Sequence, residues 1–126
     1  MDRKLLKEAI EEISSNVAEI PLIIGGEEIR TGNTGSVVMP HDHKHRLAVY
    51  HKAGRAEMEI AIKAALDAHN KWAGMSYTDR AAIIMKIAEL IKTKYRYILN
   101  AATMMGQSKN VWQAEIESAS ETTDYF

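Results

Sequence analysis

The residues with the most obvious chemical potential are histidines. His41, His43 and His45 alternate within residues 40–46, and His51 follows shortly after. On an extended strand, positions i, i+2 and i+4 share one face, so three imidazoles at this spacing could converge on a metal ion. The proline and polar residues of the same segment favour a turn between two strands instead, in which side chains splay apart. We therefore favour solvated loop histidines and predict no metal-binding residues.

Other candidate groups have a structural explanation. The chain has no cysteine, so it offers no disulfide, no thiolate metal site and no cysteine nucleophile. The glycines at 25, 26, 32 and 35 lack the strand–glycine–helix context of a phosphate loop, and turn chemistry explains them. His69 falls on an apolar helical stripe, where we expect a partly buried packing residue. The residue types alone therefore predict no catalytic and no cofactor-binding residue.

Acidic residues gather towards the end of the chain, at Glu115, Glu117 and Glu121. Glu117 and Glu121 are one helical turn apart, a spacing that is typical of a solvated helix face.

Composition describes one ordinary globular domain. The 126 residues are 46% hydrophobic and 26% charged, and the formal net charge is -1. That balance gives no electrostatic footprint for nucleic acid or an anionic membrane, and no apolar run approaches the roughly 18 residues of a membrane span. The first residues lack the apolar centre of a signal peptide and are rich in acids, so we expect a cytoplasmic location.

The elements that would position these residues fall into three parts. Residues 1–18 carry apolar residues every three or four positions behind Asp2, which predicts a capped helix. Residues 19–53 predict a small antiparallel β region: a hairpin turns at Gly25-Gly26, Pro21 lies at a strand start or edge, and short strands follow at 36–39 and 47–52.

Residues 54–126 predict three helices. The first ends at Gly74. The second is longer, is capped by Ser76 or Thr78, and ends at Gly106. The third is capped by Ser108 or Asn110. The expected fold class is therefore α+β.

The last predicted helix has an unusual inward stripe. Val111, Ala114, Ser118 and Thr122 are small or polar, which suits close packing against a partner outside this chain. No helix-ending signal precedes Tyr125-Phe126, so we expect the natural protein to continue.

Several stretches carry a family resemblance. They are residues 19–32 (EIPLIIGGEEIRTG), 39–43 (MPHDH), 61–66 (AIKAAL) with Trp72, 79–83 (DRAAI) and, most specifically, 103–116 (TMMGQSKNVWQAEI). These stretches resemble the Δ1-pyrroline-5-carboxylate dehydrogenases, a branch of the aldehyde dehydrogenase superfamily, over most of the chain. The resemblance implies the N-terminal segment of an α/β enzyme with a Rossmann-like NAD domain.

The resemblance also implies an activity. The family oxidises L-glutamate γ-semialdehyde to glutamate with NAD, in proline breakdown, and usually assembles as homo-oligomers. Its catalytic cysteine, general-base glutamate and NAD-binding strands are expected beyond residue 126, so this chain alone should bind no NAD and be inactive. Its partner is then the remainder of the enzyme chain. The glutamate of the family's QAEI motif, here Glu115, is expected to line the substrate side.

An alternative function, of a non-enzymatic class, remains open. The chain could be a stand-alone interaction or metal-binding module that uses its helical faces or histidines without catalysis. The coding sequence downstream of residue 126 distinguishes the two, because only the first reading requires a cysteine-containing continuation.

Overall fold

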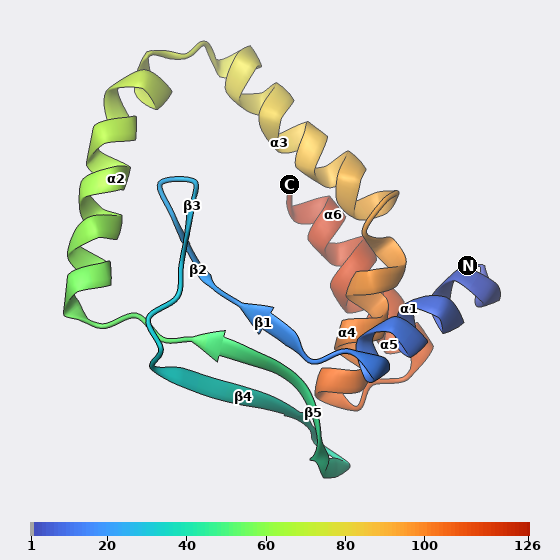
Figure 1. Ribbon diagram of the computed structural model, residues 1–126. Helices are drawn as coiled ribbons and strands as arrows, with labels where there is room; N and C mark the ends of the chain where they lie inside the picture. Colours follow the sequence, from blue (N-terminus) through green and yellow to red (C-terminus); the bar gives the residue numbers. More distant parts are fainter. Residues whose placement is uncertain (1) are drawn as a thin grey trace.

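The computed structural model describes residues 2–126 and confirms the α+β class. Figure 1 shows a small β region at one side, a cluster of helices beside it, and two long helices that rise above both. Along the chain the elements are α1 (Arg3–Ser15), β1 (Ala18–Ile20), β2 (Leu22–Ile24), β3 (Glu27–Ile29), β4 (Thr34–Met39), β5 (Asp42–His51), α2 (Arg55–Gly74), α3 (Tyr77–Lys92), α4 (Arg96–Gln107), α5 (Val111–Ala114), the π-helical segment η1 (Glu115–Ser120) and α6 (Glu121–Tyr125).

The β region is mixed, so the expectation of a wholly antiparallel region is wrong. A three-stranded sheet has the order β1-β5-β4, in which β4 and β5 are antiparallel but β1 pairs with β5 in parallel, Ala18 opposite Ala48. Two reversals, at the β2–β3 hairpin and at the β4–β5 turn, return the chain to its original direction before it pairs with β1. The first helix also ends earlier than expected, because Ala18 already belongs to β1.

The predicted hairpin is confirmed as a separate two-stranded sheet of β2 and β3. Gly25 and Gly26 have φ values of 62° and 90°, the left-handed pair that a tight hairpin turn requires. The turn expected over residues 40–46 is present but shorter: it occupies 40–41, since β5 begins at Asp42 and carries His43 and His45 as strand residues.

A small core joins the first helix to the fourth. Asp2 caps α1 as expected, its carboxylate accepting from the amide of Lys4 at 2.9 Å. Leu6 and Ala9 of α1 are buried against Ala101 of α4. The N-terminus of the chain is thereby fixed to the helix that also faces the last segment.

The predicted long helix is two helices. It breaks at Thr93, whose hydroxyl donates to the carbonyl of Glu89 at 2.6 Å, and α4 starts at Arg96. The apolar stripe runs through the break, which is why periodicity alone did not reveal it. The second helix therefore ends at Lys92, not at Gly106, which lies inside α4; Ser108 takes the left-handed cap with φ 53°.

The last segment is a continuous helical run, α5–η1–α6, with a π-helical centre. Asn110 caps its start, as expected. Ala114 and Ala119 are 0% and 2% exposed, and Ser118 bonds to α4. Ala114 and Ser118 of the predicted stripe thus pack within this chain.

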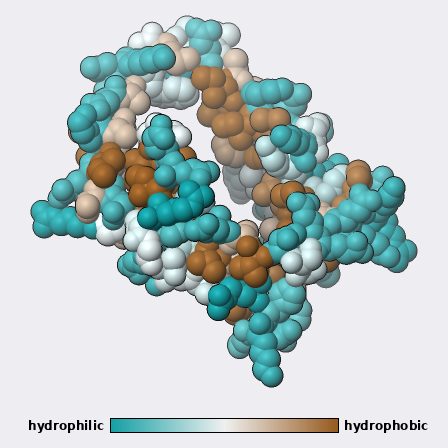
Figure 2. Space-filling model, in the orientation of Figure 1, coloured by the Kyte–Doolittle hydropathy of each residue, from teal (hydrophilic) through white to brown (hydrophobic). Residues whose placement is uncertain are grey.

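The long second helix has a different character. No residue of α2 is buried, and His69, expected to pack, is exposed. Figure 2 shows the molecule hollowed at its centre, with apolar surface over α3 and near the β2–β3 hairpin. Across residues 2–126, no helix combines the length and apolar character that a membrane crossing needs.

Candidate functional site

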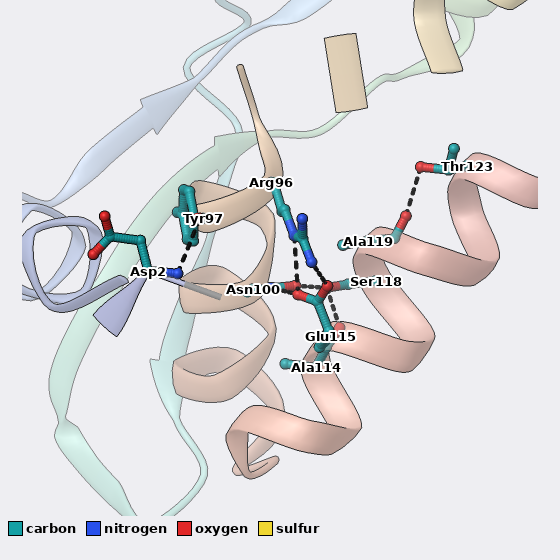
Figure 3. Close-up of polar contacts among 9 residues, drawn as sticks. All are labelled: Asp2, Arg96, Tyr97, Asn100, Ala114, Glu115, Ser118, Ala119 and Thr123. Atoms are coloured by element: carbon teal, nitrogen blue, oxygen red, sulfur yellow. Dashed lines mark hydrogen bonds and ion pairs between the residues drawn. The ribbon is translucent and has the colours of Figure 1, made fainter. Parts of the chain in front are cut away.

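The carboxylate of Glu115 lies at the first position of η1, facing α4 (Figure 3). Its side chain is only 14% exposed. Arg96 bonds both carboxylate oxygens: Nε lies 3.3 Å from Oε2, and Nη2 forms an ion pair with Oε1. Asn100 Nδ2 donates to Oε2 at 2.6 Å. One carboxylate is thus held by two side chains of the neighbouring helix.

Asn100 connects this ion pair to the next turn of the last segment. It is 0% exposed, and its Oδ1 accepts from Ser118 Oγ at 2.8 Å. Ser118 Oγ also lies 2.7 Å from the carbonyl of Ala114, so one hydroxyl proton serves the network and the helix backbone. Because buried polar groups need partners, the network fixes the register of α4 against η1. We call Arg96, Asn100, Glu115 and Ser118 the polar network.

The network holds Glu115 ionised. Burial raises the pKa of Glu115, but hydrogen bonds from Arg96 and Asn100 outweigh burial and bring the pKa below the ordinary value. The pKa of Arg96 is raised in turn, chiefly by its hydrogen bond to Glu115. A π-helical turn at this position is notable, because such turns occur frequently at functional sites.

A small polar cavity opens beside Glu115. It has a volume of about 190 Å³ and is lined by Lys92, Arg96, Glu115, Ala119, Ser120, Thr123 and Asp124. These residues come from α3, α4 and the last segment, and they carry two positive charges, two negative charges and two hydroxyls. Such a lining suits a small polar molecule with charges of both signs.

Of the residues that line this cavity, the sequence had singled out only Glu115, through the family motif and not through residue type. Arg96 and Asn100 are one helical turn apart on α4, a spacing that places them on one face. The sequence shows this spacing, but it does not indicate which face of α4 packs against the last segment.

The histidines do not converge. His41 Nδ1 lies 2.9 Å from Ser108 Oγ, His43 is exposed on β5, and within residues 2–126 no group of three histidine, cysteine or acidic residues is placed to hold a metal ion. His51 is buried on β5 between two partners of the β region.

Those partners of His51 are Glu19 and the amide of Gly32. His51 Nε2 lies 3.0 Å from Glu19 Oε1, and Nδ1 accepts from Gly32 N at 3.2 Å. The pKa of Glu19 is lowered, mainly by the hydrogen bond from His51 and also by Arg30. This arrangement ties β1 and β5 to the end of the hairpin and offers no open coordination position.

A larger groove lies between α1 and α5, with a volume of about 480 Å³ and an apolar lining that includes Leu6, Ile10 and Trp112. Arg3 and Lys7 are the polar residues of its lining, which holds no acid, hydroxyl or imidazole.

Comparison with known proteins connects this geometry to an enzyme family. The model of the aldehyde dehydrogenase family matches residues 28–126. Delta-1-pyrroline-5-carboxylate dehydrogenase of Agaricus bisporus is 46% identical over 126 residues, which cover 99% of this chain and 23% of that protein. The mitochondrial enzyme of that name from Homo sapiens is 35% identical over 125 residues, which cover 99% of this chain and 22% of that protein.

Solved structures agree with the sequence relatives. The delta-pyrroline-5-carboxylate dehydrogenase of Mycobacterium tuberculosis bound with NAD superimposes with a TM-score of 0.93 at 35% identity, covering 98% of this chain and 23% of that one. The Thermus thermophilus 1-pyrroline-5-carboxylate dehydrogenase gives 0.92 at 29% identity, with 98% and 24% covered. The chain thus spans about a quarter of the length of the proteins it matches.

Proposed function

Because the chain belongs to the aldehyde dehydrogenase family, we propose that it is the N-terminal segment of an NAD-dependent enzyme that oxidises L-glutamate γ-semialdehyde to glutamate in proline catabolism. The observation that carries this proposal is the match along nearly the whole chain to proteins with that activity in their names. The QAEI motif, quoted above for its specificity, lies within the matched region.

In this proposal the chain contributes structural elements and one wall of the substrate site. It has no cysteine, so the nucleophile that attacks the aldehyde carbon must come from the remainder of the enzyme. Among residues 2–126, no glycine-rich turn joins a strand to a following helix, the arrangement that receives a dinucleotide pyrophosphate. NAD therefore does not fit here, and we assign no step through NAD to this segment.

Glu115 belongs to the substrate side in this proposal. Its carboxylate is ionised, rigidly held and adjacent to a polar cavity of amino-acid dimensions. Although it is paired with Arg96, we propose that Glu115 lies on the wall that meets the ammonium group of the substrate and that it disfavours simple aldehydes that lack one.

Steady-state kinetics of the full-length enzyme tests both the proposed reaction and the proposed role of Glu115. The wild-type enzyme should reduce NAD with pyrroline-5-carboxylate; a full-length enzyme without this activity contradicts the proposed reaction. Glu115→Ala should raise KM for this substrate or reduce its preference over an aliphatic aldehyde, while NAD affinity stays unchanged.

Glu121→Ala is the matched control, since Glu121 is exposed on the same helical run and does not line the cavity. If Glu115→Ala keeps wild-type parameters with both substrates, the assignment of Glu115 fails.

The remaining parts of the proposal concern assembly and location. We propose that the segment packs on the rest of the enzyme chain and that the enzyme forms a homo-oligomer, which the exposed apolar surface of α2 supports. We also propose a cytoplasmic location. Relatives from Dictyostelium discoideum and Homo sapiens are named as mitochondrial, so cell fractionation with an antibody to this segment is the direct test.

A further inference from the structure

We propose that the groove between α1 and α5 binds a monocarboxylate of the fatty-acid type, whose alkyl chain lies on the apolar floor and whose carboxylate is bound by Arg3 and Lys7. Figure 1 places α1 and α5 beside each other at the N-terminal edge of the helix cluster, away from α2. The groove shares no lining residue with the cavity beside Glu115. The inference therefore goes beyond the proposed dehydrogenase activity and does not rest on it.

The floor of the groove is an apolar surface that the fold itself holds in place. Leu6 is buried in the core that α1 forms with α4, and Ile10 and Val111 pack against that core. The volume of about 480 Å³ lies within the range of small-molecule sites, which are mostly apolar and carry a few placed polar groups. The groove has both the size and the composition of such a site.

Trp112 forms an uncovered aromatic wall of the groove. Its side chain is 75% exposed. Its backbone is held at the start of α5, because Asn110 Oδ1 accepts from the amides of Trp112 at 3.0 Å and of Gln113 at 3.1 Å. An alkyl chain that lies against the indole removes apolar surface of both groups from water, which favours binding.

Two positive charges without acidic partners stand beside this apolar surface. Arg3 and Lys7 are one turn apart on α1, and within residues 2–126 neither side chain forms an ion pair or a hydrogen bond, whereas Lys4 pairs with Glu8. No acid lines the groove. A neutral hydrocarbon would leave both charges unmatched, and a small inorganic anion would leave the apolar floor in water. An anionic head on an alkyl chain is complementary to both.

The short length of α5 favours a small ligand over a docked partner helix. A helix that binds in a groove is held by side chains over several turns. The α5 helix is four residues long and contributes only Val111 and Trp112 to the groove. One alkyl chain needs no longer contact surface.

Equilibrium dialysis of radiolabelled decanoate against the full-length enzyme tests the site. We expect saturable binding with a dissociation constant of about 0.1–1 mM. Competition by unlabelled acids from hexanoate to decanoate should show affinity rising about three- to fourfold with each methylene, as burial of an alkyl chain requires. Decan-1-ol and decylamine have alkyl chains of the same length without the carboxylate, so each should bind about tenfold more weakly.

Variants of the full-length enzyme separate the roles of the charge and the indole. Lys7→Gln should weaken decanoate about fivefold but leave decan-1-ol unchanged, whereas Trp112→Ala should weaken both about fivefold. Lys7→Arg and Trp112→Phe keep the charge and the aromatic ring, so they should retain most of the affinity. Lys4→Gln is the matched control, because Lys4 is exposed on the same helix and lies outside the groove.

The site is overturned by any of several outcomes. They are no saturable binding of decanoate, an affinity that does not rise with chain length, equal affinity for decanoate and decan-1-ol, and equal losses in Lys7→Gln and Lys4→Gln. Saturating NAD and L-glutamate should leave decanoate bound; displacement by either would mean that decanoate occupies the active site instead. Because dialysis requires no turnover, its result is independent of whether the enzyme oxidises pyrroline-5-carboxylate.

Discussion

Asn100 is the residue on which the register of the last segment depends most directly. It is fully buried, yet polar, and it serves as donor to Glu115 and acceptor from Ser118. Asn100→Ala removes both contacts and leaves a carboxylate oxygen with one partner fewer, so the free energy of unfolding should fall by about 1–3 kcal/mol. Urea unfolding measures this loss.

The same substitution at Asn70 is the control for the Asn100 variant. Asn70 is exposed on α2 and forms no side-chain hydrogen bond within residues 2–126, so Asn70→Ala should be neutral or slightly stabilising. Equal losses at both positions would contradict a structural role for the polar network.

Glu115 gives this network a pH dependence with a defined sign. Burial raises the pKa of Glu115, but the hydrogen bonds of Arg96 and Asn100 lower it below the unfolded value of 4.5. A carboxyl group whose pKa is lower in the folded state stabilises the fold above its unfolded pKa and loses that contribution as pH falls through its folded pKa.

The resulting prediction compares wild type with Glu115→Gln. The difference in unfolding free energy should be constant above about pH 5.5 and shrink progressively below pH 4.5, where wild type becomes neutral too. Chemical denaturation across this pH range measures it. A difference that grows in acid would show that the folded-state pKa of Glu115 is raised.

Whether the sequence could predict a residue of the candidate site depends on whether that residue belongs to a local motif or gains its role from tertiary packing. Glu115 was proposed from a family motif, which can be read directly in the sequence. Arg96 and Asn100 owe their importance to the break at Thr93 and to the packing of α4 against the last segment. That placement is a tertiary fact, so no local pattern in the sequence could have selected these residues.

For the helices and strands, capping and turn residues predicted where an element begins or the chain turns better than they predicted where a helix ends. Asp2, Ser76 and Asn110 cap helices as expected, because a capping side chain acts on amides two or three residues away. The α3–α4 break and the π-helical turn have no such local marker. The parallel pairing of β1 with β5 also joins residues far apart in sequence, so periodicity could not reveal it.

Gly35 illustrates how one element depends on a residue without a side chain. It pairs with Tyr50 across β4 and β5, and a Cβ at this position would overlap the Tyr50 ring. Gly35→Ala should therefore lower the free energy of unfolding by about 1 kcal/mol, because the Tyr50 ring, 38% exposed, must turn aside. Thermal or urea unfolding of the chain measures the effect.

A double-mutant cycle separates the Gly35 clash from a general effect of alanine. Adding Tyr50→Ala should remove much of the Gly35→Ala loss, so the two changes will not be additive. Gly74→Ala is the control, because a Cβ there meets no atom within 4 Å and the residue ends α2. Strict additivity would mean that Tyr50 is not the obstacle.

For the whole molecule, the proposed function predicts inactivity in isolation. The purified 126-residue chain should not reduce NAD in the presence of pyrroline-5-carboxylate, because hydride transfer in this family follows attack by a cysteine thiolate and the chain has none. Absorbance of NADH measures this. Turnover that follows the chain through successive purification steps would contradict the proposal.

The last prediction concerns association of the isolated chain. The α2 helix buries no residue, and its Met58, Ile62 and Leu66 side chains are 59%, 60% and 67% exposed. They recur at helical spacing and form one apolar face, and an exposed face of this kind favours association. We expect the chain to sediment as a mixture of monomer and larger species, with the larger fraction rising with concentration.

A charge-matched pair of variants shows whether this face of α2 causes the association. Ile62→Glu with Leu66→Glu places two carboxylates on the apolar face and should shift the chain towards monomer. His69→Glu with Asn70→Glu adds the same number of carboxylates to exposed polar positions of the same helix, so it should leave the distribution close to wild type. If both variants become monomeric, net charge governs association; if neither does, the contact lies elsewhere. Only a selective effect of the first variant identifies α2 as the surface that packs against another polypeptide.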